Sequence, residues 1–317
     1  MKFAFIVDPL DELKIYKDST YAMMREAAHR GHELYAMLQG DLAWHRGSVV
    51  GNAARLHLTG TQDASWYRLD APADMALTSY DVVLMRKDPP FDMEYVYTTY
   101  LLELAEMQGA RIVNRPRAVR DHNEKMAIAR FPQFTAPSLV TRREGLIREF
   151  LAEHGDVILK PLHGMGGASI FRITQNDPNV SVIIETLTAY GAQSIMAQQY
   201  IPAIRDGDKR VLLIGGEPVP YALARIPKPG ETRGNLAAGG TGVAQQLTPR
   251  DRLIAEALAP LLYREGLLLV GLDVIGDYLT EVNVTSPTCF QEIMQQTDFD
   301  VAGMMIDALE RLVDPAS

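Results

Sequence analysis

Short apolar runs alternate with amphipathic segments over the first third of the chain. Four runs have the length and composition of buried parallel strands: residues 3–7, 33–38, 81–86 and 111–114. Two segments that start at an aspartate and stop at or before a glycine predict capped helices: residues 18–31 and 92–108. Alternating polarity around Arg46-Gly47 predicts a hairpin over 44–58. This strand–helix alternation predicts a mostly parallel sheet covered on both faces.

The pattern changes near residue 115. Helices are predicted over residues 120–130, 144–154, 249–264 and 298–313. Strands are predicted over 138–141, 157–161, 169–173, 211–214 and 221–224, with a hairpin over 271–283. The chain therefore divides into three lobes: a mostly parallel α/β domain over 1–122, a small α+β domain over 123–200 and a larger mixed α+β domain over 201–317.

Composition and charge exclude several classes of protein. Among 317 residues, Lys and Arg number 31 against 40 Asp and Glu, a formal charge of −9, which argues against general nucleic-acid binding. The single cysteine, Cys289, excludes an intrachain disulfide and any site with two Cys ligands, and it favours a reducing compartment. The first apolar stretch ends at Asp8-Pro9, and no run reaches the roughly 20 apolar residues that span a bilayer. We expect a cytoplasmic protein without a membrane partner.

A glycine-rich loop is the strongest local signal of chemistry. Gly164, Gly166 and Gly167 free backbone N–H groups to approach an anion, because no Cβ stands in the way. Lys160, on the preceding strand, can reach a phosphate. The P-loop spacing is missing, and the dinucleotide fingerprint fails because Ser169 takes its last position and a strand follows. A phosphate-covering loop is favoured over a flexible hairpin connection.

Two carboxylates and a carboxamide fall together in the hairpin 271–283. Glu281 and Asn283 share a face because strand side chains alternate, and a three-residue turn over 276–278 would set Asp273 opposite Glu281. Such carboxylates repel each other unless a cation neutralises them, and all-oxygen ligands suit Mg²⁺. The alternative is a solvated face without a metal.

Cationic residues surround a long glycine-rich loop over 227–242, which has the length of a functional lid. Arg210, Arg225 and Arg233 can neutralise charge on a transferred phosphoryl group, although each taken alone is typical of an ordinary surface arginine. Arg86 and Lys87 follow the third strand of the first lobe, where ligands of open α/β sheets bind, and can hold a substrate carboxylate. A solvated turn is the alternative there.

Taken together, these residues resemble the ATP-grasp carboxylate–amine ligases and, within that superfamily, the bacterial glutathione synthetases. The resemblance runs nearly end to end and rests on residues 81–92, 123–125, 158–172, 206–211, 217–221, 224–227, 230–240, 270–277 and 279–289. The stretches 85–90 and 232–240 are the most specific. The resemblance implies an ATP-grasp fold with a pre-ATP-grasp N-terminal domain and a central lid domain.

The resemblance also implies a site for ATP between the second and third lobes. The implied ATP contacts are Lys125, Lys160, Gly164, Gly166, Gly167, Ala168, Ser169, Gln198, Gln199, Tyr200, Ile201 and Asp208. Mg²⁺, with Mn²⁺ as a substitute ion, would be held by Asp273, Glu281 and Asn283. One departure lies at the hinge, where many superfamily members carry an acidic residue and this chain has Gln198 and Gln199.

The implied reaction is the ATP-dependent ligation of γ-glutamylcysteine to glycine. ATP phosphorylates the cysteinyl carboxylate, and the amine of glycine attacks the acyl phosphate to give glutathione, ADP and phosphate. The implied catalytic residues are Arg210, Arg225 and Arg233, and the implied substrate contacts are Arg86, Lys87, Arg233, Asn235 and Ser286. The bacterial enzymes are tetramers, so the resemblance implies a homo-oligomer.

Two other functions remain open from the sequence. A different ligase of the superfamily, such as a D-alanine–D-alanine ligase or an amino-acid-adding enzyme, would share the ATP site and differ in the stretch 85–90 and in the lid. A non-catalytic nucleotide-binding scaffold would need a broken metal set, whereas Asp273, Glu281 and Asn283 are all present.

Overall fold

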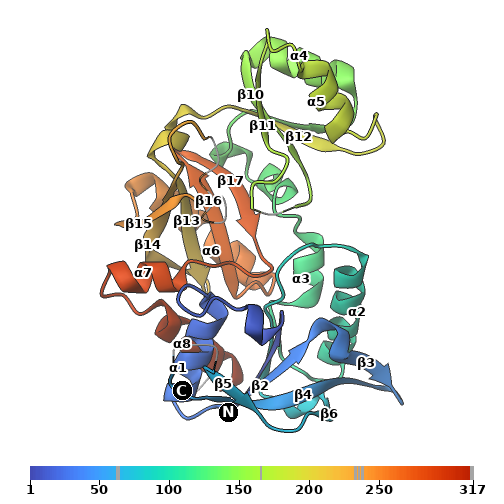
Figure 1. Ribbon diagram of the computed structural model, residues 1–317, viewed down its shortest axis with the longest axis vertical. Coiled ribbons are helices and arrows are strands. Elements are labelled where there is room, and N and C mark those ends of the chain that lie inside the picture. Colours follow the sequence, from blue (N-terminus) through green and yellow to red (C-terminus); the bar gives the residue numbers. More distant parts are fainter. Residues whose placement is uncertain (62–64, 165, 232–233, 235, 237–238, 315–317) are drawn as a thin grey trace.

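Three sheets, one in each lobe, organise the molecule. A computed structural model of the chain describes residues 1–61, 65–164, 166–231, 234, 236 and 239–314. Figure 1 shows the small central lobe at one end of an elongated molecule, the third lobe in the middle and the first lobe at the other end. Arg233 and Asn235, two of the predicted site residues, lie outside the described residues.

The first lobe contains an eight-stranded mixed sheet. Its main path runs β3-β4-β2-β1-β7-β8, and β5 and β6 also pair with β4. Its strands are β1 (Lys2–Val7), β2 (Glu33–Leu38), β3 (Leu42–His45), β4 (Ser48–Leu58), β5 (Tyr67–Leu69), β6 (Ala73–Ala76), β7 (Val82–Met85) and β8 (Ile112–Val113). Its helices are α1 (Ser19–His29), α2 (Met93–Met107) and α3 (Pro116–Asp121). The four strands β2, β1, β7 and β8 are parallel, and the hairpin β3–β4 adds the antiparallel edge.

The two helix caps and the hairpin turn of this lobe agree with the predictions from the sequence. The Asp18 carboxylate accepts a hydrogen bond from the backbone N–H of Tyr21 at 2.7 Å and caps the start of α1. The Asp92 carboxylate caps the start of α2 by accepting the N–H of Tyr95 at 2.9 Å. The hairpin turns at Arg46 and Gly47, whose φ angles of 51° and 84° are those of a tight two-residue turn. These predictions are confirmed.

The predicted helix over 120–130 is wrong. The chain forms α3 from Pro116 to Asp121, then leaves the helical conformation and makes a 3₁₀ turn over Met126–Arg130. The Asn123 side chain accepts the backbone N–H groups of Lys125 at 3.1 Å and Met126 at 3.0 Å. Such a local side-chain bond competes with helix hydrogen bonding and breaks the segment in two.

The central lobe is a four-stranded antiparallel sheet with two helices on one face. The strand order is β11-β10-β12-β9. Its elements are β9 (Ser138–Thr141), α4 (Glu144–His154), β10 (Asp156–Pro161), β11 (Phe171–Thr174), α5 (Val180–Leu187) and β12 (Ile195–Gln199). Ten buried apolar residues from this lobe form a cluster of their own, among them Ile147, Leu159 and Ile184. Met196, on the opposite face of β12, belongs to the cluster of the other two lobes.

The third lobe is a five-stranded antiparallel sheet in the order β15-β14-β13-β16-β17. Its strands are β13 (Asp208–Ile214), β14 (Glu217–Ile226), β15 (Thr241–Gln246), β16 (Leu269–Ile275) and β17 (Tyr278–Asn283). Its helices are α6 (Pro249–Arg264), α7 (Phe290–Gln296) and α8 (Val301–Val313). Short 3₁₀ turns in the described part of the chain include Leu10–Glu12, Gln39–Asp41, Leu77–Ser79, Met126–Arg130, Pro132–Phe134 and Pro202–Asp206.

The first and third lobes share buried apolar clusters. One cluster joins Phe3 and Phe5 of β1 to Phe290 of α7 and Val301 of α8. At its edge, Arg30 at the end of α1 pairs with Asp307 at 2.6 Å and with Glu310 at 2.9 Å. The two lobes therefore form a single body, on which the central lobe sits.

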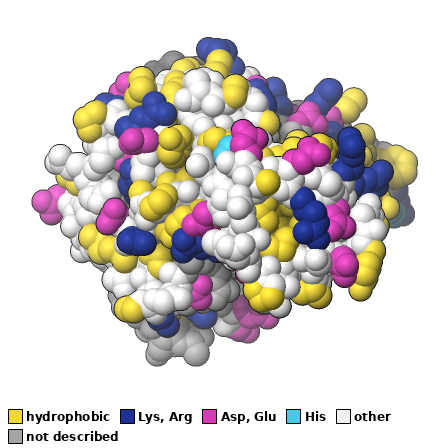
Figure 2. All heavy atoms as spheres, turned by 90° about the horizontal axis from the view of Figure 1, so that it is seen from above, with side chains coloured by type: hydrophobic (Ala, Val, Ile, Leu, Met, Phe, Trp, Pro, Cys, Tyr) yellow, Lys and Arg dark blue, Asp and Glu magenta, His cyan; other side chains and the backbone are white. Residues whose placement is uncertain are grey.

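The surface carries charges of both signs. Figure 2, a view from above, shows Lys and Arg interspersed with Asp and Glu on that face rather than gathered by sign. No helix in the described part of the chain combines the length and apolar character that crossing a bilayer requires.

Asn114 is expected to be essential for the joint between the first and third lobes. Its buried amide donates to the carbonyls of Leu269 at 2.7 Å and Val284 at 2.8 Å, and its oxygen accepts the N–H of Leu269 at 3.0 Å. We predict that Asn114→Ala lowers the free energy of unfolding by roughly 2–4 kcal/mol, because buried backbone groups lose their partners. Urea unfolding measures this change. Asn52→Ala, which removes an exposed bond to Asp74, is the control, and equal midpoints for the two variants would contradict the prediction.

Candidate active site

A cavity of about 270 Å³ lies where the three lobes meet. Most of the sequence-predicted site residues line its wall: Lys125, Lys160, Gly164, Gly166, Gly167, Ala168, Gln198, Gln199, Tyr200, Ile201, Asp208, Arg210, Arg225, Asp273, Glu281, Asn283 and Ser286. Among the described residues, Ser169, Arg86 and Lys87 lie beside the cavity rather than on this wall. The fold thus brings together segments that are far apart in the sequence.

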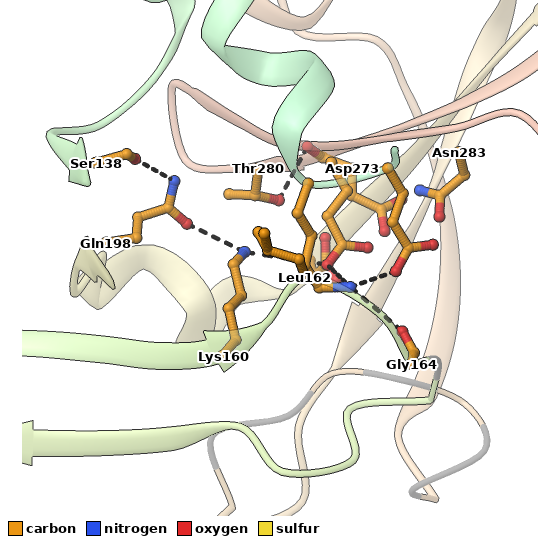
Figure 3. A network of polar contacts seen from close by, with 12 residues as sticks. Ser138, Lys160, Leu162, Gly164, Gln198, Asp273, Thr280 and Asn283 are labelled. Carbon is orange, nitrogen blue, oxygen red and sulfur yellow. Dashed lines mark hydrogen bonds and ion pairs between the residues drawn. The ribbon is translucent and has the colours of Figure 1, made fainter. Parts of the chain in front are cut away.

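The glycine-rich loop joins β10 to β11 and covers one side of the cavity. Gly164, Gly166 and Gly167 have φ angles of 106°, 68° and 79°, in the region that side chains with a Cβ avoid. The Lys125 ammonium donates to the Gly164 carbonyl at 3.3 Å (Figure 3). The glycines are therefore needed for the course of this loop, whatever it covers.

Lys160 projects from β10 beside Gln198 of the neighbouring strand β12. Its Nζ lies 3.4 Å from the Gln198 Oε1, and the Gln198 Nε2 donates to the Ser138 hydroxyl at 2.9 Å (Figure 3). The nearest carboxylate, that of Glu281, is 4.0 Å from Nζ. Burial lowers the pKa of Lys160. The Lys160 ammonium is thus a buried donor whose close neighbour is a neutral amide.

The predicted acidic set shares one sheet face. Asp273 on β16 is directly opposite Glu281 on β17, and Gly271 is opposite Asn283. The turn, however, has two residues, Gly276 and Asp277, where three were expected; a bulge at Thr280 restores the register. The Thr280 hydroxyl donates to the Asp273 carbonyl at 3.1 Å and holds this bulge. The facing pair was predicted correctly and the turn length was not.

Two arginines hold Asp273. Arg210 on β13 donates two hydrogen bonds to the Asp273 carboxylate, from Nε to Oδ1 at 2.6 Å and from Nη2 to Oδ2 at 3.1 Å. The Arg225 Nη2, on β14, lies 2.9 Å from the Asp273 Oδ2. Burial works to raise the pKa of Asp273, but the two guanidinium groups outweigh it and hold that pKa below its ordinary value. Both arginines are nearly completely buried, so their orientation is fixed by this carboxylate.

Asp208 is the second carboxylate at these arginines. Arg225 donates to its Oδ2 at 2.5 Å, whereas its Oδ1 is buried without a hydrogen-bond partner among the described residues. Burial raises the pKa of Asp208 to about 7, and the charge of Asp273 adds to the rise against the opposing effect of Arg225. The free oxygen can accept a hydroxyl or amine from a ligand.

Glu124 is a cavity residue that sequence reasoning missed. Its carboxylate pairs with Lys125, and its backbone carbonyl accepts the N–H of Val282 on β17 at 2.8 Å. Burial, together with the charge of Glu281, raises the pKa of Glu124 to about 7. Its neighbour Lys125 was singled out, but only the fold reveals that the segment lies against β17. Asp88, Thr288 and Cys289 also line the cavity and were not predicted to.

Arg86 and Lys87 each make polar contacts within the protein. Arg86, only 6% exposed, donates to the Pro287 carbonyl at 2.9 Å and the Thr20 hydroxyl at 3.1 Å, and Lys87 pairs with Asp8 at 2.6 Å. Ser286 faces the cavity and donates to Asp88 at 2.5 Å. Arg86 therefore holds the segment that presents Ser286, while one of its nitrogens, Nη1, lacks a partner among the described residues.

The oxygen atoms of the acidic set suit a hard cation. The described residues contain no cluster of three His, Cys, Asp or Glu side chains with metal-ligand geometry, so a metal here would draw a ligand from Asn283. The Asn283 Nδ2 donates to the Gly271 carbonyl at 3.3 Å, which leaves its oxygen available. Two carboxylates and one amide oxygen on a single face fit Mg²⁺, which keeps waters and shares substrate phosphates.

Comparison with known proteins identifies the family along the whole chain. A family model described as the prokaryotic glutathione synthetase N-terminal domain matches residues 1–120, and one for the ATP-grasp domain of the same family matches residues 124–298. The glutathione synthetase of Nitrosomonas europaea is 66% identical over 313 residues, which are 98% of each chain. That of Ralstonia nicotianae is 65% identical over 317 residues, 100% of this chain and 98% of its own.

Solved structures agree on the fold at much lower identity. The D-cycloserine synthetase DcsG superposes with a TM-score of 0.69 at 15% identity, covering 99% of this chain and 100% of its own. The ATP-grasp ligase PsnB, solved with minimal precursor, Mg and ADP, has a TM-score of 0.62 at 17% identity and 98% coverage of both chains. The resemblance noted in the sequence is thereby confirmed, and the chain belongs to the prokaryotic glutathione synthetases, ATP-dependent ligases of the ATP-grasp fold.

Proposed function

We propose that this chain joins γ-glutamylcysteine to glycine in the cavity between its lobes, using ATP and an acyl-phosphate intermediate. The observation that carries the proposal is the arrangement of charges around that cavity. Lys125 and Lys160 lie on the wall with the glycine loop, and Arg210 and Arg225, fixed by Asp273, lie on the wall of the third lobe. A polyanion between these walls meets cations on both sides.

The nucleotide is proposed to lie between the central and third lobes. Lys125, Lys160 and the loop from Gly164 to Ser169 would contact the phosphates. The backbone of residues 199–201 would face the adenine, because the side chain of Gln198 is bonded to Ser138 and Lys160. The partnerless oxygen of Asp208 suits a ribose hydroxyl. Tyr200 at this segment is held by the Arg172 guanidinium, 3.7 Å from its ring.

Asp273, Glu281 and Asn283 are proposed to hold Mg²⁺, with Mn²⁺ as a substitute ion. The bound ion would neutralise phosphate charge during transfer. The chain supplies the rest of the electrostatic stabilisation. The Arg210 fork, oriented by two bonds from Asp273, would stabilise negative charge on the transferred phosphoryl group without reorganising.

The dipeptide substrate is proposed to occupy the end of the cavity lined by Asp88 and Ser286. Its cysteinyl carboxylate would attack the γ-phosphorus of ATP, and ADP would leave. The glycine amine would then attack the acyl carbon, and phosphate would leave. The loop 227–242, with Arg233 and Asn235 outside the described residues, is proposed to cover this step, because water would hydrolyse an acyl phosphate.

Several broader features of the protein belong to the same proposal. The enzyme would be cytoplasmic and a homotetramer, with functional domains over 1–122, 123–200 and 201–317. Asp273, Glu281 and Asn283 on one face support a working ligase over a nucleotide-binding scaffold that has lost its metal set.

Release of ADP tests the reaction directly. The purified chain is incubated with Mg-ATP and γ-glutamylcysteine, with and without glycine. The ADP released is measured, and the product is identified by mass spectrometry. We expect ADP release that depends on glycine, with glutathione as the product. Turnover with D-alanine or another amino-acid pair alone would move the substrate assignment to a different ligase, and ATP binding without turnover would favour the scaffold.

Arg210→Lys tests the oriented guanidinium fork. Lysine keeps the charge but cannot make two parallel bonds to Asp273, so the cation loses its fixed orientation. We predict a fall in kcat of about 10²-fold with a small change in the KM for ATP, as for loss of one preorganised donor. Steady-state kinetics measure both constants. Arg148→Lys, at a surface pair with Glu144, is the control, and an unchanged kcat in Arg210→Lys would refute this assignment.

Gln198→Glu tests the neutral neighbour of Lys160. A carboxylate at this position would pair with the buried ammonium and reduce its attraction for phosphate. We predict a rise of roughly tenfold in the Kd for ATP, equivalent to about 1.4 kcal/mol, while the protein remains folded. Calorimetric titration with ATP measures it. Gln193→Glu, at an exposed position near β12, should bind ATP like the parent chain, and equal affinities for both variants would count against a positioning function of Gln198.

A further inference from the structure

Three side chains from neighbouring strands of the central lobe contact one another at one end of its sheet. Arg172 lies on β11, Asp156 is the first residue of β10, and Tyr200 directly follows β12. The strand β10 pairs with both of the others (Figure 1). We call these three residues the Arg172 bridge. Of the three, Tyr200 alone lines the cavity.

Each member of the Arg172 bridge contacts the other two. The Arg172 guanidinium donates to both carboxylate oxygens of Asp156, from Nε to Oδ1 at 2.9 Å and from Nη2 to Oδ2 at 2.6 Å. Its central carbon lies 3.7 Å from the centre of the Tyr200 ring. The Tyr200 N–H donates to the Asp156 carbonyl at 3.0 Å. The planar guanidinium is thus oriented by two parallel bonds and held over an aromatic face.

Arg172 is on the face of the sheet that borders the cavity. Side chains alternate between the two faces along a strand, and Val157 and Ile173 belong to the apolar cluster between the sheet and its helices. The next pair along the same strands, Ile158 and Arg172, therefore points to the other face. Ile158 lines the cavity. Arg172 thus shares the face that forms the wall, although it does not line the cavity itself.

The Arg172 bridge connects two segments that both line the cavity. The glycine-rich loop returns to the sheet through Ile170 and enters β11 at Phe171, directly before Arg172. Residues 199–201, which include Tyr200, follow a different strand and also line the cavity. Because Arg172 contacts Tyr200, the position of this second segment depends on the returning end of the loop. Asp156 fixes both to the start of β10.

The Arg172 bridge adds little to the stability of the lobe. The side chains of Arg172 and Asp156 are 37% and 33% exposed, and water screens the charges of an ion pair at such a position. The lobe is held together instead by its own apolar cluster. What the two parallel bonds and the ring contact do supply is a fixed orientation. We therefore expect the loss of Arg172 to affect the placing of Tyr200 more than folding.

We propose that Arg172 is a positioning residue for the nucleotide, which sets residues 199–201 at a fixed place relative to the returning end of the glycine-rich loop. The inference rests on the proposed function, because it takes the adenine to lie against residues 199–201 and the phosphates to lie under the loop. A ligand that contacts both segments binds more tightly when they are already in place, since less ordering occurs on binding. Arg172 acts through Tyr200 and touches no substrate. The dipeptide, at the other end of the cavity, is unaffected.

Arg172→Ala tests this positioning function. Calorimetric titration gives the Kd for ATP, and steady-state kinetics give kcat and the KM values for ATP and γ-glutamylcysteine. We expect the Kd and KM for ATP to rise about fivefold, while kcat and the KM for γ-glutamylcysteine stay within about twofold of the parent. The control is Arg148→Ala, which removes an ion pair with Glu144 on a helix of the same lobe, and both variants should unfold at the same temperature. An unchanged Kd for ATP, or a loss shared by all the kinetic constants, would overturn the proposal.

Two further variants separate orientation from charge. Arg172→Lys keeps the positive charge but cannot make two parallel bonds to Asp156, so we expect its Kd for ATP to be closer to that of Arg172→Ala than to that of the parent. Tyr200→Leu removes the ring, and in that background Arg172→Ala should change the Kd by less than about twofold, because residues that act through one contact are not additive. Full recovery with lysine, or independent effects of the two substitutions, would reject the bridge.

The same titrations distinguish this inference from the proposed function. A parent chain that binds no ATP would overturn both. A parent chain that binds ATP and releases ADP in the presence of glycine, together with an Arg172→Ala variant of equal affinity, would overturn the positioning function alone.

Discussion

The cavity depends on one buried contact, the carboxylate of Asp273 held between Arg210 and Arg225. Charges taken out of water are costly unless they are paired and hydrogen-bonded, so these three side chains fix one another. They come from β13, β14 and β16, neighbouring strands in the middle of the third sheet. The antiparallel pairing of the strands sets the spacing of the two arginines, and the Asp273 carboxylate sets the orientation of their guanidinium groups. Asp208 adds a second acceptor on the same side.

A second constraint comes from the way the lobes are joined. The first and third lobes share buried clusters and the amide of Asn114, so the wall with the arginines and the segment around Ser286 belong to one body. The wall with Lys160 belongs to the central lobe, which has a separate cluster. The cavity therefore lies between two bodies and is lined by residues of both. Its geometry depends on their relative position as well as on each local fold.

Sequence reasoning succeeded where a short period or a local cap decides the structure. Period-two alternation placed Glu281 and Asn283 on one face, and Asp18 and Asp92 marked the starts of their helices. The pairing of Asp273 with Glu281 was predicted correctly because the extra residue expected in the turn offset the unforeseen bulge at Thr280. Sequence reasoning failed where a single side chain or a segment distant in the sequence determines the local structure. The bulge at Thr280 and the break at Asn123 depend on individual hydrogen bonds, and the helices α5 and α7 were not predicted. Glu124 reaches the cavity only because its backbone joins β17.

The separate apolar cluster of the central lobe has a consequence for thermal behaviour. Ten small and medium-sized apolar residues form that cluster, whereas the rest of the chain is stabilised by clusters that span two lobes. Regions with fewer buried contacts open at lower free energy and do so as cooperative sub-domains. The half of the cavity that the central lobe forms is therefore expected to be the first part to melt on warming. A bound nucleotide that bridges both halves would protect it by mass action, so the cell's supply of ATP would also serve as a folding ligand.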